Sequence, residues 1–288
     1  KEWFEREMKM TNYALIKSND DWDTKNNEAH FDDTDLFIED KEIDGAGTFL
    51  PVALGAFDHL MGAVRDDNYQ KVKEFLDLDY MAKYMALFTI VNVSHPITGD
   101  NLKYIYDFTS GKFKILFRLE DNIILPIKNN IDKFNQSLFS SVEPYSNALT
   151  HQLFKILTRS SEFRYMRDKE MMNLIDDSNS LFDTIEKTYA SNNNVVLNSN
   201  LPRRQIKYQK EIFEKNLRNN LSVAKEYLSY SKIYATVTQM DNKYEIRFIN
   251  DSFHPIALTN ILYKTKSSET YNFRISSPEL DNEMKIIY

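Results

Sequence analysis

Hydrophobic residues recur three and four positions apart over much of residues 51–92, which is the spacing of one face of a helix. Asp66 or Asp67 can begin a short helix that ends at Phe75, and Asp77 or Asp79 can cap the helix that follows. We expect this third helix, near residues 79–92, to be central and buried. The apolar positions of the first helix are Leu54, Phe57, Leu60, Met61 and Val64.

The hydrophobic period changes at residues 102–118. Two β-rich stretches, 102–107 and 112–117, alternate between apolar and polar residues. The residues between them, Phe-Thr-Ser-Gly, are typical of a turn. The sequence therefore predicts a β-hairpin here.

Helical spacing returns over residues 144–230 and predicts three shorter helices followed by one long helix. Asn200 is a candidate cap of the long helix, and Pro202 lies near its first turn. Short β-rich stretches follow Ser231, which indicates a small β-sandwich appended to the helical body. The four apolar sets are Leu149, Leu153, Leu157; Phe163, Met171, Leu174, Ile175; Leu181, Phe182, Ile185, Tyr189; and Phe213, Leu217, Leu221, Ala224, Leu228.

The N-terminal part has a weaker pattern. Residues 1–16 fit a short helix or strand, and residues 18–48 are acidic and poor in structural signals. This acidic segment fits a solvated connecting loop, or alternatively a cation-binding or lid segment, although it lacks the spacing of an EF-hand. The predicted fold class is α+β in three parts: residues 1–50, a helical body at 51–230 and a β-domain at 231–288.

The amino-acid composition argues against several classes of protein function. The chain has 288 residues, with 36 Lys and Arg against 43 Asp and Glu, and a net charge of −7 argues against a nucleic-acid partner. The absence of Cys excludes disulfides, thiol catalysis and cysteine metal sites. The sequence contains no run of about 18 apolar residues, so we expect no transmembrane segment. The chain begins at Lys1, which either a removed signal peptide or trimming explains.

The common catalytic motifs are missing, and the five histidines show no pair at metal-ligand spacing. One arrangement stands out around the predicted hairpin. Asn101 directly precedes it, and Glu120 and Asp121 follow it. Protein kinases place a catalytic-loop Asn before a short hairpin and a metal-binding Asp after it, because the hairpin returns the chain to the same point.

Residues 95–113 resemble the CotH family, the spore-coat-type atypical protein kinases. The family's Leu-Asp-x-Asp-x-x-x-x-Tyr helix is similar to residues 76–84, and its hairpin with a Thr-Gly-Lys turn is similar to residues 101–113, where the turn is Thr-Ser-Gly-Lys. Its later core helix and closing helix are similar to residues 153–164 and 216–228. The resemblance covers about residues 50–230 and implies a mostly helical, kinase C-lobe-like body.

The resemblance also implies a chemistry: binding of ATP with Mg²⁺ or Mn²⁺, and phosphoryl transfer to a Ser or Thr hydroxyl of a protein substrate. Asn101 would hold the metal ion with Glu120 and Asp121, and Asn101 and Arg118 would contact the nucleotide. Tyr80 and Tyr84 would pack beneath this site.

Departures from the family pattern weaken the expectation of activity. Pro96 stands where the family has its catalytic Asp, which leaves His95 or Asp100 as the candidate base. Arg118 replaces one anionic metal ligand, and this charge reversal should weaken metal binding. The residues before position 50 are too few for a kinase N-lobe, and Lys17 is the nearest candidate for the lysine that grips ATP.

Other interpretations remain open from the sequence alone. Asn101 also fits a simple turn residue, and Arg118 with Glu120 or Asp121 fits a structural ion pair. The protein would then be a non-enzymatic scaffold on an extracytoplasmic or bacterial cell surface that binds a protein or glycan partner. A third alternative is a pseudokinase that binds ATP and changes shape without turnover. The sequence does not fix the oligomeric state. Five aromatic residues of the β-domain are candidates either for an exposed binding surface or for a buried β-sandwich core: Tyr234, Tyr244, Phe248, Tyr263 and Tyr271.

Overall fold

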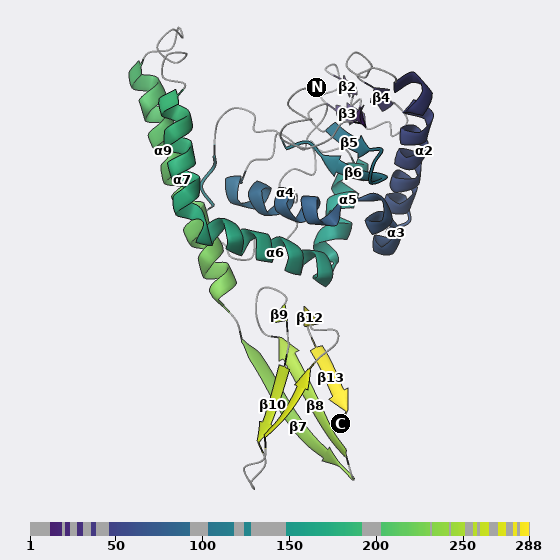
Figure 1. Ribbon diagram of the computed structural model, residues 1–288, viewed down its shortest axis with the longest axis vertical. Coiled ribbons are helices and arrows are strands. Elements are labelled where there is room, and N and C mark those ends of the chain that lie inside the picture. The colour runs from purple at the N-terminus through teal and green to yellow at the C-terminus, as the bar shows by residue number, and fades with distance from the viewer. Residues whose placement is uncertain are drawn as a thin grey trace.

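The computed structural model confirms the α+β class, with a four-stranded sheet packed against one side of a helical body and further antiparallel strands beyond the helices (Figure 1). Side chains are described for residues 12–16, 51–92, 103–117, 124–127, 152–191, 207–230, 232–239, 241 and 245–250. The described backbone comprises residues 12–18, 21–23, 28–30, 36–38, 46–92, 103–117, 124–127, 148–191, 203–230, 232–241, 243–250, 256–257, 260–264, 270–274, 279–280 and 283–287.

The first helices are α2 (Ala46–Arg65), α3 (Tyr69–Phe75) and α4 (Leu78–Val91). Helix α2 begins five residues before Pro51, earlier than the sequence predicts. The cap of α3 is Asn68, whose side chain accepts a hydrogen bond from the Lys71 amide at 3.1 Å. Asp67 does not begin the helix, because its φ of 52° lies in the left-handed region.

Helix α4 confirms the prediction of a central buried helix. Its N-cap is Asp77, which accepts a hydrogen bond from the Tyr80 amide at 3.1 Å. Apolar residues are buried along its length and join one large core cluster with α2, α5 and the sheet. The buried residues of α4 are Met81, Ala82, Tyr84, Met85, Ala86, Phe88, Thr89, Ile90 and Val91.

The predicted hairpin is confirmed as β5 (Lys103–Asp107) and β6 (Lys112–Ile115). Its turn ends at Gly111, whose φ of 67° favours glycine, and Asp107 accepts a hydrogen bond from the Thr109 amide. Strand β1 (Tyr13–Ser18) pairs antiparallel with β5, and β4 (Leu36–Ile38) pairs with β1, which gives the order β4-β1-β5-β6. The N-terminal segment is therefore part of the same sheet as the hairpin.

The acidic segment predicted as a loop contains three short strands instead. Strands β2 (Asp21–Asp23) and β3 (Glu28–His30) pair with each other, and β4 extends the main sheet. Three residues are too few to show an alternating pattern, so pairing partners specify these strands and local sequence does not.

The later helices match the sequence prediction: α5 (Ala148–Arg159), α6 (Ser161–Asp176), α7 (Ser178–Ser191) and α9 (Arg203–Ser229). Helix α6 packs along α4, and α7 lies beside α9 (Figure 1). A buried polar group joins α6 to α9, since Arg167 pairs with Asp168 at 2.7 Å and the Tyr227 hydroxyl donates to Asp168 at 3.3 Å. The predicted cap Asn200 and Pro202 lie outside the described residues.

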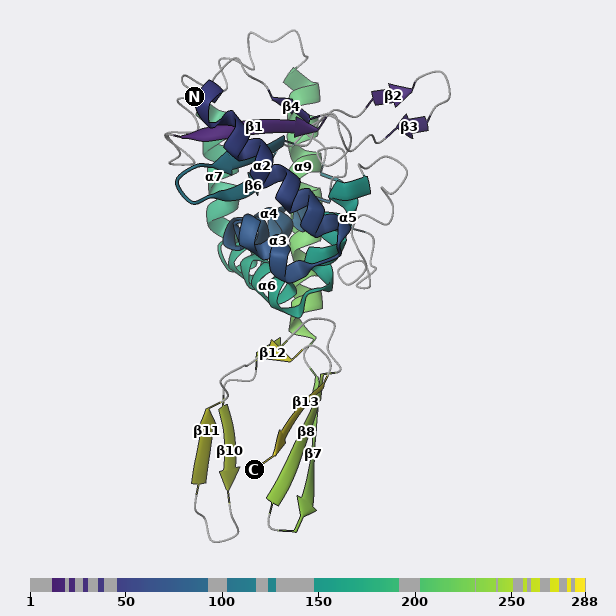
Figure 2. The ribbon, with the colours of Figure 1, turned by 90° about the vertical axis from the view of Figure 1, so that its right-hand side faces the viewer.

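The chain after α9 is made of short antiparallel strands, as predicted. Strands β7 (Ile233–Met240), β8 (Lys243–Asn250) and β13 (Glu283–Ile287) form one sheet in the order β13-β8-β7. Strands β10 (Asn260–Lys264) and β11 (Thr270–Arg274) form a second pair, which Figure 2 shows beside the first sheet. Strands β9 (Ile256–Ala257) and β12 (Glu279–Leu280) pair nearest the helices. Among the described residues, no helix has the length and apolar character to cross a membrane.

Candidate functional site

The residues that the sequence predicts for the site fall in two segments, 93–102 and 118–123, and both lie outside the described residues. The structure does describe the residues that flank each segment. We call these flanking residues, with the side chains that hold them, the frame of the proposed site. The predicted site residues concerned are His95, Asp100, Asn101, Arg118, Glu120 and Asp121.

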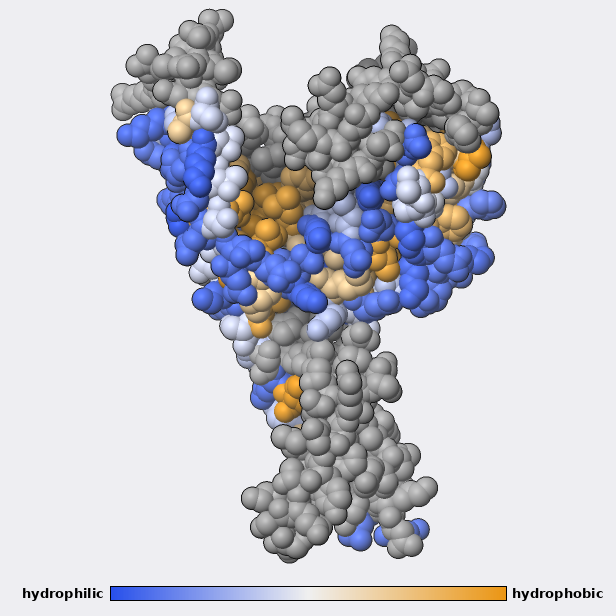
Figure 3. Space-filling view, in the orientation of Figure 1, coloured by the Kyte–Doolittle hydropathy of each residue, from blue (hydrophilic) through white to orange (hydrophobic). Residues whose placement is uncertain are grey.

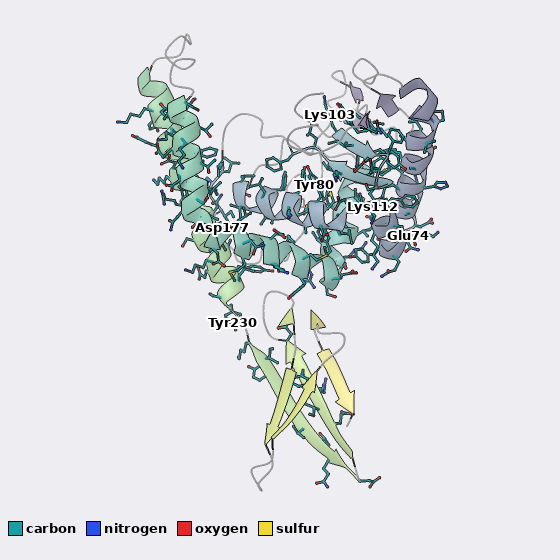
Figure 4. All side chains as sticks on the ribbon, viewed as in Figure 1. Glu74, Tyr80, Lys103, Lys112, Asp177 and Tyr230 are labelled. Carbon is teal, nitrogen blue, oxygen red and sulfur yellow. The ribbon has the colours of Figure 1, made fainter. Side chains whose placement is uncertain are left out.

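The end of segment 93–102 and the start of segment 118–123 are joined by a backbone hydrogen bond. The Leu116 amide donates to the Lys103 carbonyl at 2.9 Å, one step beyond the ladder of β5 and β6. Tyr80 of α4 fixes the same strand end, because its hydroxyl donates to the Ile115 carbonyl at 2.9 Å. Figure 4 labels Tyr80 on α4 and Lys103 on β5 above it. Both segments therefore meet the sheet at one point over α4.

Two tyrosines one turn apart on α4 support this strand end in different ways. Burial raises the pKa of Tyr80 to about 12, a hydrogen bond with the Phe117 backbone lowers it, and the charge of Asp77 raises it. Burial also raises the pKa of Tyr84, whose ring packs edge-on against Phe117 at 5.6 Å between centroids. Both hydroxyls therefore stay protonated at neutral pH.

The other ends of the two segments also meet. Asn92 is the C-cap of α4, in the left-handed conformation with φ 51°, and it is the last described residue before segment 93–102. Its side-chain amide lies 3.3 Å from the Leu125 carbonyl and 3.4 Å from the Pro126 carbonyl. Residues 124–127 are the first described residues after segment 118–123, so both segments are held together at both ends.

Three asparagines of α9 hold residues 124–127 by their backbone, and we call Asn216, Asn219 and Asn220 the asparagine clamp. Asn216 donates to the Ile124 carbonyl at 2.7 Å, and Asn219 donates to the Ile127 carbonyl at 3.2 Å.

Asn220 is the buried centre of the clamp. It accepts from the Ile127 amide at 2.7 Å and donates to the carbonyls of Ile90 and Leu125 at 2.7 and 2.8 Å. The sequence interpretation missed this residue. A signal was present, because Asn220 occupies a position of the apolar stripe of α9 between Leu217 and Leu221, where a polar residue must find buried partners.

The molecular surface is hollowed above α4. Figure 3 shows a recess between the arm formed by α7 and α9 and the part that carries the sheet, with hydrophobic side chains at its bottom. Lys103 belongs to a pair of lysines at this end of the sheet, since the register places Lys17 of β1 directly opposite it.

The described side chains contain no other arrangement that suits a metal ion. No group of three or more His, Asp or Glu side chains among them is close enough to bind one. A separate open groove of about 480 Å³ has ion pairs at its edge, between Arg159 and Asp67 and between Lys73 and Glu162, and it holds no predicted site residue. Its lining comprises Asp67, Tyr69, Gln70, Ile156, Arg159, Ser160, Ser161 and Glu162.

Comparisons of this chain with protein-family models, with curated proteins and with solved structures find no match. Residues and contacts within the chain are therefore the grounds for a function.

Proposed function

We propose that this chain is a divergent, CotH-like kinase-fold protein that binds ATP with Mg²⁺ or Mn²⁺ between segments 93–102 and 118–123. The observation that carries the proposal is the joining of both ends of these segments, Lys103 to Leu116 and Asn92 to Leu125. A chain spans at most about 3.5 Å per residue, so the Cα atom of Asn101 stays within about 7 Å of that of Lys103. The same limit keeps the Cα atom of Glu120 within about 11 Å of that of Phe117, which follows Leu116 at the same joined end.

The residue types in these segments suit a metal-bound nucleotide. Asn101, Glu120 and Asp121 offer the amide and carboxylate oxygens that Mg²⁺ and Mn²⁺ prefer, and they are the residues that would hold the ion. A bound ion would supply positive charge that neutralises the charge of the phosphate oxygens. Arg118 is close in sequence to Glu120 and Asp121, and its guanidinium group would contact phosphate oxygens directly.

We propose binding with slow phosphoryl transfer or none. Pro96 has no group that accepts a proton, so the acceptor hydroxyl of a protein Ser or Thr depends on His95 or Asp100 as base. Arg118 in place of an anionic ligand weakens the metal site. A pseudokinase whose nucleotide changes its shape without turnover fits the same residues.

The proposal extends to the fold. A kinase C-lobe-like body is supported by the hairpin that stands over a buried helix and by the long closing helix α9. A β-sandwich-like C-terminal domain is supported by the two groups of strands that lie side by side in Figures 1 and 2. A protein substrate and an extracytoplasmic, bacterial setting remain part of the proposal through the family resemblance.

Thermal unfolding with ATP and Mn²⁺ tests this proposal. A ligand present at 100 times its Kd stabilises the native state by about 2.7 kcal/mol. For a chain of this size the Tm should therefore rise by about 5 °C or more. The rise should disappear in Asn101→Ala and in Glu120→Ala, because each change removes an oxygen ligand.

Matched controls change the same residue types elsewhere. Asn173→Ala on α6 and Glu211→Ala on α9 alter exposed side chains that do not belong to either segment. These variants should keep the full rise in Tm. An unchanged Tm for the unmutated chain at millimolar ATP and Mn²⁺, or a rise that survives both site variants, would contradict the proposal.

A second candidate function is a binding scaffold, and the exposed apolar side chains of strand β7 favour it. Ile233, Tyr234 and Val237 are 36, 48 and 59% exposed. Phe248 on the neighbouring strand is buried, so of the five predicted aromatic residues Tyr234 suits a surface and Phe248 suits a core. The side chains of Tyr244, Tyr263 and Tyr271 lie outside the described set. The absence of any nucleotide effect on the Tm would favour this scaffold.

A further inference from the structure

Strand β7 lies at the edge of its sheet and is exposed on both faces. Strand β8 pairs with it at every position from Ile233 to Met240, and no described strand pairs with its other side. Figure 2 shows β7 as the outermost strand of this sheet. The side chains of residues 232–239 are all exposed. The backbone N–H and C=O groups that point away from β8 can therefore pair with a further strand.

The sequence of β7 lacks the features that usually protect an edge strand from pairing. Its eight residues, Ile-Tyr-Ala-Thr-Val-Thr-Gln-Met, include no charged residue, no Pro and no Gly. Its register with β8 is unbroken, so no β-bulge turns the edge away. Natural edge strands are commonly short, or carry a charge, a Pro or a bulge that blocks a further partner. The composition of β7 therefore favours pairing.

The apolar face of this sheet continues as far as its edge. The register places Val237 opposite Ile246 and Ala235 opposite Phe248, so these four residues share one face. Phe248 is 8% exposed, whereas Val237 is 59% exposed. The face is thus covered at β8 and uncovered at β7. A further strand next to β7 would place side chains beside Val237 and remove it from water.

The charges at the two ends of β7 suit a second copy of the same strand. Lys232 directly precedes β7, where its Nζ atom lies 4.7 Å from the centre of the Tyr234 ring, and Asp241 directly follows β7. In an antiparallel pair the start of one strand meets the end of the other. Lys232 would then lie at the same end as Asp241 of the partner subunit, and no like charges would face each other between the ends.

We infer that β7 pairs antiparallel with β7 of a second copy of this chain, which joins two three-stranded sheets into one continuous sheet. Thr236 and Val237 are the central residues of β7, and Val237 belongs to the apolar face. A two-fold axis at Val237 would place the two Val237 side chains next to each other on that face. Such a dimer is closed, because both copies use the same edge. The inference is independent of the proposed nucleotide site.

Sedimentation velocity of the full chain tests the inference. Between about 1 and 100 µM, the mass should rise from that of one chain, 34.0 kDa, toward twice that value, as expected for a small interface. Val237→Lys places two like charges at the axis and should raise the Kd of the dimer by at least about tenfold. The control is Tyr208→Lys on α9, where the replaced side chain is 62% exposed, and this variant should dimerise like the unmutated chain.

A charge-swap experiment separates lost pairing from lost folding. Val237→Lys and Val237→Glu should each remain monomeric alone, because like charges meet at the axis. An equimolar mixture of the two variants should recover the dimer, since opposite charges then meet. A strand that had lost its fold would not recover in this way.

Three results would overturn the inference. They are an unmutated chain that stays monomeric up to about 100 µM, a dimer that Val237→Lys leaves intact, and a mixture of the two charged variants that stays monomeric. A monomeric chain whose β7 edge binds a strand of another protein would also exclude the second copy as its partner. None of these results bears on nucleotide binding, which the Tm experiment tests separately.

Discussion

Single polar side chains fix the backbone around the proposed site. Tyr80, Asn92 and Asn216 each place one hydrogen-bonding group on a main-chain group next to segments 93–102 and 118–123. A buried backbone group without a partner costs about 1–3 kcal/mol, so each of these side chains stabilises the structure most where the chain leaves regular secondary structure.

Two tyrosine variants on α4 separate hydrogen bonding from packing. Tyr80→Phe removes the donor to the Ile115 carbonyl and should lower the free energy of unfolding by about 1 kcal/mol. Tyr84→Phe should leave it unchanged or slightly higher, because the Tyr84 hydroxyl is buried without a hydrogen-bond partner among the described residues. Urea unfolding at neutral pH measures both. Equal losses in the two variants would contradict this assignment of roles.

At the scale of elements, helix α4 lies in the core, and the residues that cap its two ends contact the chain next to the proposed site. Asp77 begins the helix, and Asn92 ends it in the left-handed conformation and turns its amide toward residues 125 and 126. Asparagine tolerates this conformation better than most residues do, and its side chain adds contacts that glycine would lack. The end of α4 thereby belongs to the frame of the site.

Substitutions at Asn92 test this cap. Asn92→Gly keeps the left-handed conformation and loses only the long contacts to the Leu125 and Pro126 carbonyls. Asn92→Ala also forces a side chain into that conformation, so it should be less stable than Asn92→Gly by about 1 kcal/mol. Denaturant unfolding of both variants gives the difference, and equal stability would show that φ at this position relaxes without cost.

The sequence predicted elements whose pattern is long and regular. Helices α4, α5, α6, α7 and α9 and the β5–β6 hairpin appear where hydrophobic spacing and turn residues indicate them, and Asp77 is a predicted cap. The pattern could not reveal β4, whose three residues depend on a partner distant in sequence. Asn68, the cap of α3, is a favoured N-cap residue, and the sequence interpretation chose Asp66 or Asp67 in its place. The asparagine clamp joins residues about 90 positions apart, which no local pattern encodes. The predicted site residues themselves stay predictions.

At the scale of the whole molecule, the site frame draws on distant parts of the chain. Strand β1 supplies a neighbour of β5, α4 lies beneath the hairpin, and α9 holds residues 124–127 before the chain enters the C-terminal strands. In Figure 1 the hairpin and α9 lie toward opposite ends of α4. The central claim is that segments 93–102 and 118–123 share one site in this frame.

Cross-linking measures that claim directly, because the chain has no cysteine of its own. The double variant Asn101→Cys with Glu120→Cys should be joined rapidly by a short thiol-specific reagent. The control pairs Asn101→Cys with Asp241→Cys, in the turn between β7 and β8 at the end of the sheet far from the helices (Figures 1 and 2). Fast cross-linking of the first pair alone is the predicted result. Equal, slow reaction of both pairs would contradict a shared site.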